Sequence, residues 1–501
     1  MNEVSNVKKN FFVSIITQII TISFSLVVPR LMISYYGAQL HGLTSVITGL
    51  ISYLTLVEAG FGAASLQSLY KPLQEKDINK INGCLNEITI FYKKIGSIFS
   101  ILVVLISLIY PFIAADNLSY MFVMILIIVS GLAQTIEYFF CSKYKLLLQA
   151  DKRLYVLNSI NSFGILLQGI LRIIMILLKF DIILVQLIPA IVYICRLLLI
   201  KAYVKKTYNY LDKTIEPIES VGDKKWNVLI HQISNLVVNN TDSIVLSTFV
   251  GYTSVSIYSI YSMITNNING FLNQALSNAI TANFGHLVSE GNKEKINEIF
   301  SYYEKVYNYI IIIIFSLVMV LIVPFVELYT KSITNIEYAN YILAFLFVLN
   351  AILANIRIPY LTMVNATGTF KETQNHAILE AVINIVFSII LVNHIGIYGV
   401  LIGTTISYFV RDILFIWFVN EKILNRNIYN SLKNIMRSTI MIMILVIVNS
   451  CIIKSIHVIS WFYWLSSGIL TTIITLIIIV SYIVLYDKKS MKLIKKFLKI
   501  N

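Results

Sequence analysis

Fourteen apolar stretches follow one another along almost the whole chain, and they are the strongest constraint on its fold. A bilayer core needs roughly 20 apolar residues of helix to be crossed, and each stretch is long enough. The sequence therefore predicts an all-α polytopic membrane protein. The expected spans are residues 11–35, 42–66, 92–114, 118–142, 155–179, 182–204, 226–250, 254–281, 304–328, 338–364, 374–393, 397–420, 434–453 and 459–486.

The basic residues predict which side of the membrane each loop occupies. Most of the 39 Lys and Arg residues lie in alternate gaps between the stretches, whereas the intervening gaps hold only Lys179, Lys331 and Lys454. Loops rich in Lys and Arg stay in the cytoplasm. We therefore expect an even number of crossings and a cytoplasmic location for both termini.

Composition excludes several classes of function. The chain is 57% hydrophobic and only 13% charged, and the loops are too short for a soluble catalytic domain. The net charge of +14 lies in juxtamembrane loops, where topology and anionic lipid headgroups explain it better than nucleic acid does. The four cysteines have no metal-ligand spacing. We expect no enzyme activity, no metal and no cofactor.

Two halves of the chain resemble each other at an offset of roughly 211 to 216 residues. Residues 35–43 align with 249–257, 81–82 with 296–297, 149–151 with 365–367, and Arg196 with Arg411. Six spans per half is an even number, so the repeats have parallel orientation. The predicted parts are an N-lobe at 1–204, a cytoplasmic linker at 205–225, a C-lobe at 226–420 and a C-terminal helix pair with a basic tail at 421–501.

Polar side chains recur on single faces of several spans. The stripes are Ser14, Gln18, Thr21 and Ser25 in the first span, His231, Asn235, Asn239 and Asp242 in the seventh, and Ser262, Asn266, Asn269 and Asn273 in the eighth. Polar groups inside a membrane usually face a partner or a wet cavity. The stripes predict a hydrated passage, although hydrogen bonds between neighbouring helices would also explain them.

The remaining ionisable residues divide by depth. Arg30 and Arg172 are expected in the outer halves of the first and fifth spans, and Glu58, Glu137 and Glu380 toward inner ends. The side chains of Arg196, Arg357 and Arg411 are near inner ends, from which a long side chain can reach the membrane interface. We expect that behaviour for these three arginines.

Several short segments, in their order and spacing, resemble one family of transporters. They are residues 29–31, 36–37, 42–43, 58–62, 241–247, 365–371, 380–385 and 396–404. The chain is similar to polysaccharide flippases of the multidrug/oligosaccharidyl-lipid/polysaccharide exporter superfamily. The resemblance implies fourteen spans, two pseudo-symmetric six-helix lobes and alternating access, in a bacterial cytoplasmic membrane.

The resemblance also implies a substrate and some of the residues that bind it. Such proteins move undecaprenyl-pyrophosphate-linked oligosaccharide to the outer leaflet, so the expected partners are this anionic glycolipid, membrane lipids and polysaccharide polymerase machinery. Arg30 and Arg172 would meet the pyrophosphate, because Arg is suited to phosphate oxygens. Gln18, Asn239, Asn266 and Asn269 would line the path, and Asp242 and Glu58 would couple transport to a proton or sodium gradient.

Two alternatives stay open at this point. A cation-coupled multidrug exporter would favour acidic residues in the passage, and Glu58, Glu137 and Asp242 keep that option open. A peptidoglycan lipid-precursor flippase is the second alternative. The sign of the charge that lines the passage separates an anionic from a cationic substrate.

Overall fold

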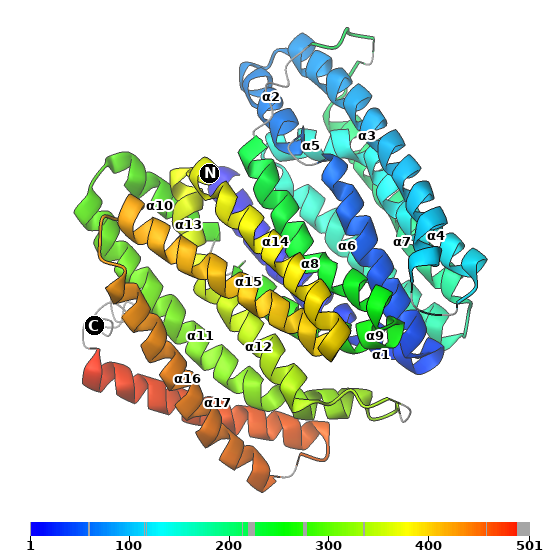
Figure 1. The fold of residues 1–501 in the computed structure, drawn as a ribbon. Coiled ribbons are helices and arrows are strands. Elements are labelled where there is room, and N and C mark those ends of the chain that lie inside the picture. The colour runs from blue at the N-terminus through cyan, green and yellow to red at the C-terminus, as the bar shows by residue number, and fades with distance from the viewer. Residues whose placement is uncertain are drawn as a thin grey trace. The chain divides into compact units, whose positions relative to one another are not determined.

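The computed structural model describes residues 2–58, 61–114, 116, 118–212, 214–218, 226–273, 278–333, 336–456 and 458–487, and it divides into two compact units, Met1–Ser259 and Ile260–Asn501 (Figure 1). The described residues are nearly all helical and contain no strand. The prediction of an all-α protein is confirmed. The first unit contains α1 (Asn2–Leu54), η1 (Thr55–Glu58), α2 (Phe61–Glu75), α3 (Ile78–Ile113), α4 (Tyr120–Ile136), η2 (Glu137–Cys141), α5 (Ser142–Ala150), α6 (Leu154–Leu177), α7 (Ile182–Thr207) and α8 (Trp226–Phe249).

Helix α9 (Tyr252–Leu272) crosses the boundary between the units. The second unit continues with α10 (Asn278–Glu290), α11 (Lys293–Thr330), α12 (Tyr341–Ile356), α13 (Ile358–Thr367), α14 (Phe370–Ile395), α15 (Ile397–Phe418), η4 (Val419–Ile423), α16 (Tyr429–Ile456) and α17 (Trp461–Tyr486). The four predicted parts stay predictions. Much of the predicted linker and the basic tail after residue 487 lie outside the described residues.

Eleven helices in the described part of the chain are long and apolar enough to cross a membrane. One of them, Ile16–Glu58, covers most of the first two predicted spans, which are separated by a break in the backbone at Gly37 within α1. The predicted span 226–250 corresponds to α8, and the predicted span 254–281 corresponds to α9 and the start of α10. These helices are not among the eleven. Their polar stripes lower the hydropathy, so the two most polar predicted spans are the two that composition alone does not identify.

Glycines interrupt the helices at two positions that the repeat alignment pairs. Gly37 has φ +84° and Gly251 has φ +114°. A backbone with φ in this range is open to glycine at little cost and strained for other residues. The first break divides α1 and the second separates α8 from α9.

Helix starts are also repeated. The side chain of Asp77 accepts from the backbone N–H of Lys80 at the start of α3, and that of Asn292 accepts from Lys295 at the start of α11. Such caps satisfy backbone donors that a helix start leaves unpaired. The hydrogen bonds from Lys80 hold the pKa of the Asp77 carboxyl below its ordinary value.

The paired asparagines 82 and 297 perform the same task in each unit. The Asn82 amide donates to the carbonyl of Tyr210, and its oxygen accepts from the N–H of Asp212, at 3.0 Å each. The Asn297 amide donates to the carbonyl of Leu424 at 2.7 Å. In both units this residue therefore ties the start of a long helix to the segment that follows the sixth span of the half.

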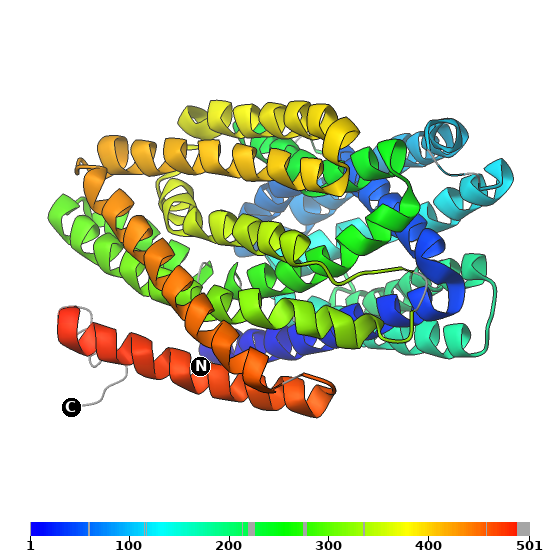
Figure 2. The ribbon, with the colours of Figure 1, turned by 60° about the horizontal axis from the view of Figure 1, so that its bottom comes forward.

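Packing inside each unit follows from these elements. In the first unit, α1 packs on α6 and α8, and α7 packs on α4 and α6. In the second unit, α14 and α15 lie side by side along most of their length, and α16 and α17 pack on α11 (Figure 2). The last two spans, α16 and α17, thus contact the rest of the second unit through α11.

Gly42 in α1 allows a close helix contact inside the first unit, and this generates a prediction. A Cβ at Gly42 would overlap the backbone carbonyl of Tyr252, which cannot move aside as a side chain would. We expect Gly42→Ala to lower the stability by about 1–3 kcal/mol through overpacking. The thermal unfolding of the purified protein in detergent measures this. The control is Gly49→Ala in the same helix, where a Cβ meets Asn240 at an ordinary 3.8 Å. Equal unfolding temperatures for the two variants would contradict the account.

Candidate functional site

A cavity of about 400 Å³ lies within the first unit, among α1, α6 and α7. Its lining combines small hydroxyl side chains with apolar ones and one Arg: Thr21, Phe24, Ser25, Val28, Pro29, Met32, His41, Thr44, Ser45, Thr48, Ile165, Gln168, Gly169, Arg172 and Gln186. No Asp or Glu is among these lining residues. The cavity is therefore cationic.

Arg172 of α6 supplies the charge of this cavity. One of its terminal nitrogens donates to Oε1 of Gln186 on α7 at 2.6 Å. Its Nε is buried and has no hydrogen-bond partner in the described part of the chain. A guanidinium has five N–H donors and no acceptor. Arg172 thus lines a cavity and keeps donors for an anionic group, and its role in substrate binding stays a prediction.

The first polar stripe contributes only in part. Thr21 and Ser25 line the cavity, together with Pro29, because residues three and four apart lie on one face of a helix. Gln18 and Arg30 are half-buried and are not among the lining residues. Ser14 lies outside the residues whose side chains are described. The structure therefore brings Arg172 to the cavity and leaves Gln18 and Arg30 beside it.

The seventh-span stripe makes local contacts in the first unit. The Asn239 amide donates to the backbone carbonyl of Asn235 at 2.7 Å, and both side chains are exposed. Asp242 is 1% exposed and accepts from the hydroxyl of Tyr258 at 2.8 Å. Asn239 is thus accessible to a ligand within this unit, whereas Asp242 is enclosed.

A second cavity of about 360 Å³ in the first unit contains the acids that the sequence pointed to. Glu58 accepts from the hydroxyl of Tyr92 at 2.5 Å, and Glu137 pairs with Lys145. Glu137 begins η2, a one-turn π-helix between α4 and α5. Such widened turns are frequent at functional sites. The two carboxylates of this cavity, with Lys145 beside them, thus lie apart from Arg172 in the first cavity.

The eighth-span asparagines are described in the second unit. Asn266 donates to Ser262 one turn earlier at 3.0 Å. The Asn269 oxygen accepts from Asn355 at 2.6 Å, and Asn355 in turn accepts from the hydroxyl of Tyr307 at 3.1 Å. Asn269 therefore belongs to a chain of hydrogen bonds between helices, which is the alternative explanation that the sequence left open.

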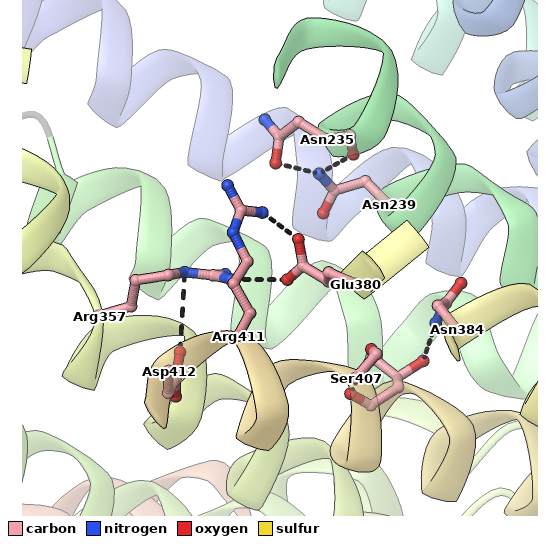
Figure 3. Close-up of polar contacts among 9 residues, drawn as sticks. Asn235, Asn239, Arg357, Glu380, Asn384, Ser407, Arg411 and Asp412 are labelled. Carbon is pink, nitrogen blue, oxygen red and sulfur yellow. Dashed lines mark hydrogen bonds and ion pairs between the residues drawn. The ribbon is translucent and has the colours of Figure 1, made fainter. Parts of the chain in front are cut away.

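The second unit buries a cluster of four charged side chains, drawn in Figure 3. Glu380 of α14 binds Arg357, at the joint between α12 and α13, through one oxygen at 2.6 Å, and Arg411 of α15 through the other. Nε of Arg357 also lies 3.8 Å from Asp412. All four side chains are buried.

The expectation that Arg357 and Arg411 reach the interface is wrong, because both guanidinium groups are held inside the protein by Glu380. Arg196 donates to the carbonyl of Asn161 at 3.3 Å and lies over the ring of Tyr193. One signal in the sequence could have revealed the cluster. Three consecutive predicted spans, 338–364, 374–393 and 397–420, together contain Arg357, Arg411, Glu380 and Asp412. Equal numbers of opposite buried charges favour pairing.

The buried cluster generates a prediction about stability. Glu380→Gln keeps the shape of the side chain but leaves Arg357 and Arg411 without their carboxylate. Removing one partner of a buried ion pair typically costs about 3–5 kcal/mol. We expect a clear fall in the unfolding temperature in detergent. Glu298→Gln, at an exposed acid on α11, is the control and should have little effect. A fall of the same size in both variants would contradict the stabilising role of the cluster.

Solved structures with the same fold are found among transporters. An inward-facing multidrug resistance MATE family transporter of the MOP superfamily has a TM-score of 0.66 and 16% identity, with 84% of this chain and 95% of that chain covered. The lipid II flippase MurJ in an inward closed conformation has a TM-score of 0.65 and 14% identity, with 95% of this chain and 99% of that chain covered. At these identities the likeness shows the fold alone. No curated protein sequence matches the chain.

The sequence itself matches a family model. The model described as polysaccharide biosynthesis protein matches residues 7–281, which is more than half of the chain and includes both cavities of the first unit. The resemblance drawn from the short motifs is thereby confirmed. With its many apolar helices, the chain is a multi-pass membrane protein. It belongs to the polysaccharide biosynthesis protein family, whose fold it shares with the MATE and MurJ transporters.

Proposed function

We propose that this protein is a flippase that moves undecaprenyl-pyrophosphate-linked oligosaccharide from the cytoplasmic to the outer leaflet by alternating access. Its product would serve cell-surface polysaccharide synthesis, to which the family description also refers. The observation that carries the proposal is Arg172, the one Arg or Lys among the residues that line the cavity of the first unit.

The chemistry of the cavity suits an anionic headgroup. A diphosphate in a low-dielectric site needs fixed cationic donors, and the planar guanidinium of Arg172 matches phosphate oxygens. Thr21, Ser25 and Gln168 add neutral groups of the kind that hydrogen-bond sugar hydroxyls. The apolar lipid tail would stay in the bilayer, so only the headgroup needs a polar path.

The distribution of basic residues supports the location. Lys and Arg are concentrated in alternate gaps, which favours a cytoplasmic location for both termini under the rule that basic loops remain there. We propose a bacterial cytoplasmic membrane, in which such a flippase would hand its product to polysaccharide polymerase machinery. Transport would need no bound cofactor.

A multidrug exporter is the second candidate, and the cavity with Glu58 and Glu137 favours it. Two carboxylates in one cavity attract a cationic ligand, although Lys145 neutralises one of them. The third candidate, a lipid-precursor flippase, would take a diphosphate as well, so the sugar decides between it and our proposal. Ion coupling through Asp242 and Glu58 stays a prediction in each case.

Arg172 provides the direct test of the proposal. We expect Arg172→Ala to lower the export of lipid-linked sugar roughly 10- to 100-fold, because a charge-assisted hydrogen bond is worth about 1.5–3 kcal/mol. Arg172→Lys should retain part of the activity, since it keeps the charge without the planar fork. Export is measured as surface polysaccharide in a flippase-deleted host. Purified protein in vesicles with a labelled lipid-linked oligosaccharide then reports translocation directly.

Lys179→Gln is the matched control, because it removes an exposed positive charge just beyond the same helix. It should leave export unchanged. If the wild-type protein moved a cationic dye but not the labelled glycolipid, the substrate assignment would be wrong and the exporter would be favoured. Normal export by Arg172→Ala at normal protein levels would contradict the role of Arg172 in substrate binding, on which the proposal rests.

Arg30→Ala tests the role that the family resemblance gives to this residue. We expect it to abolish export while the protein stays in the membrane, because Arg30 would supply a second cation for the diphosphate beside Pro29 of the cavity lining. The same host and vesicle measurements apply. Unchanged export would show that Arg172 acts without Arg30.

A further inference from the structure

Asp412 is the member of the buried cluster whose charge is least compensated. It is 3% exposed, and neither of its carboxylate oxygens has a hydrogen-bond partner in the described residues. Glu380 uses its two oxygens for Arg357 and Arg411, so Asp412 faces only the Nε of Arg357 at 3.8 Å, which is beyond hydrogen-bond distance (Figure 3). A buried carboxylate without donors is costly.

The groups around Asp412 come from three helices. Helix α14 contributes Glu380, and one turn earlier His376, whose ring packs against aromatic residues of α15. The α12–α13 joint contributes Arg357, and α15 itself contributes Arg411 and Tyr408, the ring of which lies 5.1 Å from the Arg357 guanidinium. With Asp412 ionised, the four charges of the cluster cancel.

The other ionisable groups near α15 are engaged elsewhere. Tyr360 of α13 donates to Glu304 at 2.7 Å, and Glu421 and Lys422 of η4 are exposed. The charges that act on Asp412 are therefore mainly those of Arg357, Arg411 and Glu380.

We propose that Asp412 is a proton-binding site, and that its protonation state decides which carboxylate Arg357 binds. The inference rests on the proposed transport function and names the group that couples it to a proton gradient. It assigns that role to a residue of the second unit, other than Asp242 and Glu58.

Two opposing effects make this exchange feasible. Burial without hydrogen-bond donors favours the neutral acid, whereas the nearby guanidinium of Arg357 favours the carboxylate. The guanidinium thus offsets part of the cost of the charged form, and the proton can be exchanged between Asp412 and water. When the O–H proton leaves to water, Asp412 gains one negative charge, and the cluster changes from a net charge of +1 to zero.

The loss of the proton gives Arg357 a second carboxylate to bind. Its Nε already lies 3.8 Å from Asp412, so a small movement forms a charged hydrogen bond and weakens the bond to Glu380. Arg357 stands where α12 ends and α13 begins, directly before Ile358-Pro359. Proline cannot continue the backbone hydrogen bonds of a helix, so this joint is a natural bending point. The proton thereby acts on the angle of the joint.

A sodium ion fits this place poorly. It would have to bind Asp412 beside the two guanidinium groups that already occupy Glu380, and the repulsion between like charges at these distances is strong in an apolar interior. A proton needs only one oxygen of Asp412. The coupling ion in this proposal is therefore the proton.

The first experiment needs no transport substrate. Infrared difference spectra of the reconstituted protein, recorded across a pH step, report the C=O stretch of a protonated carboxylic acid. We expect a band in the wild-type protein that is lost in Asp412→Asn and shifted in Asp412→Glu. Glu421→Gln, an exposed acid replaced by the same chemistry, should keep it. A wild-type spectrum without such a band, or a band unchanged in Asp412→Asn, overturns the proposal.

The second experiment measures coupling in vesicles with labelled lipid-linked oligosaccharide. We expect an imposed proton gradient to speed wild-type translocation about tenfold, a sodium gradient to leave it unchanged, and Asp412→Asn to move the glycolipid at one rate with or without the proton gradient. Gradient-driven transport by Asp412→Asn equal to that of the wild type, or acceleration by sodium alone, overturns the inference while the transport function stands. A wild-type protein that moves no glycolipid refutes the proposed function, and the infrared result still decides whether Asp412 binds a proton.

Asp412→Asn is nearly isosteric and mimics the protonated acid, so we expect its thermal unfolding to match that of the wild type. Should it fail to fold, Asp412→Glu serves in its place. The longer carboxylate remains able to bind a proton and should retain gradient dependence with a shifted pH profile. A folded Asp412→Glu variant could keep the infrared band and lose the gradient dependence. That result would show that proton binding at this position does not drive transport, and it would overturn the coupling role of Asp412.

Discussion

The free-energy cost of an ionised side chain in an apolar interior governs where function can reside in this chain. Such a charge needs a partner, a wet cavity or a proton. Arg172 has a cavity and one neutral partner, Gln186, so its remaining donors are available to an anion. Arg357 and Arg411 have a shared carboxylate and are satisfied inside the protein. Asp412 has no hydrogen-bond donor among the described residues, because Arg357 and Arg411 bind Glu380 instead. Three solutions to one electrostatic problem therefore distinguish the proposed binding group, a buried ion-paired cluster and the proposed proton-binding group.

The backbone is subject to the same restriction, because an apolar medium offers no hydrogen bonds to an open helix. The chain departs from regular helix at few kinds of position in the described residues. Gly37 and Gly251 absorb positive φ, and η2 and the α12–α13 joint interrupt the fourth and tenth predicted spans. These interruptions coincide with polar groups: Glu137 begins the first and Arg357 stands at the second. At these two interruptions a charged side chain therefore lies at the break itself.

The sequence predicted the elements far better than the partners of the polar side chains. Long apolar runs identified most of the spans, although α8 and α9 fall short in hydropathy, and the repeat was visible because Gly37 and Gly251 occupy matching positions. It did not reveal that α3 and α11 begin 14 and 11 residues before the predicted starts, at polar caps that a hydropathy average hides. It predicted polar surroundings for both Arg30 and Arg172, but it could not show that Arg172 lines the cavity and Arg30 does not. Nor could it show that Arg357 and Arg411 bind Glu380. Those contacts depend on side-chain direction and helix rotation, which spacing along one helix does not fix.

Paired positions of the repeat carry different chemistry in the two units. Arg196 and Arg411 occupy paired positions, yet Arg196 rests on Tyr193 and a backbone carbonyl, whereas Arg411 binds a buried acid. The first unit holds an arginine with spare donors in a cavity, and the second holds a nearly neutral cluster around a joint in a helix pair. In the mechanism that we propose, substrate binding adds an anion to the first unit, and a proton changes the net charge of the second by one. In a transporter built from two related halves, such a division lets one half carry the affinity for the substrate and the other carry the dependence on the gradient, so that neither charge has to serve both purposes.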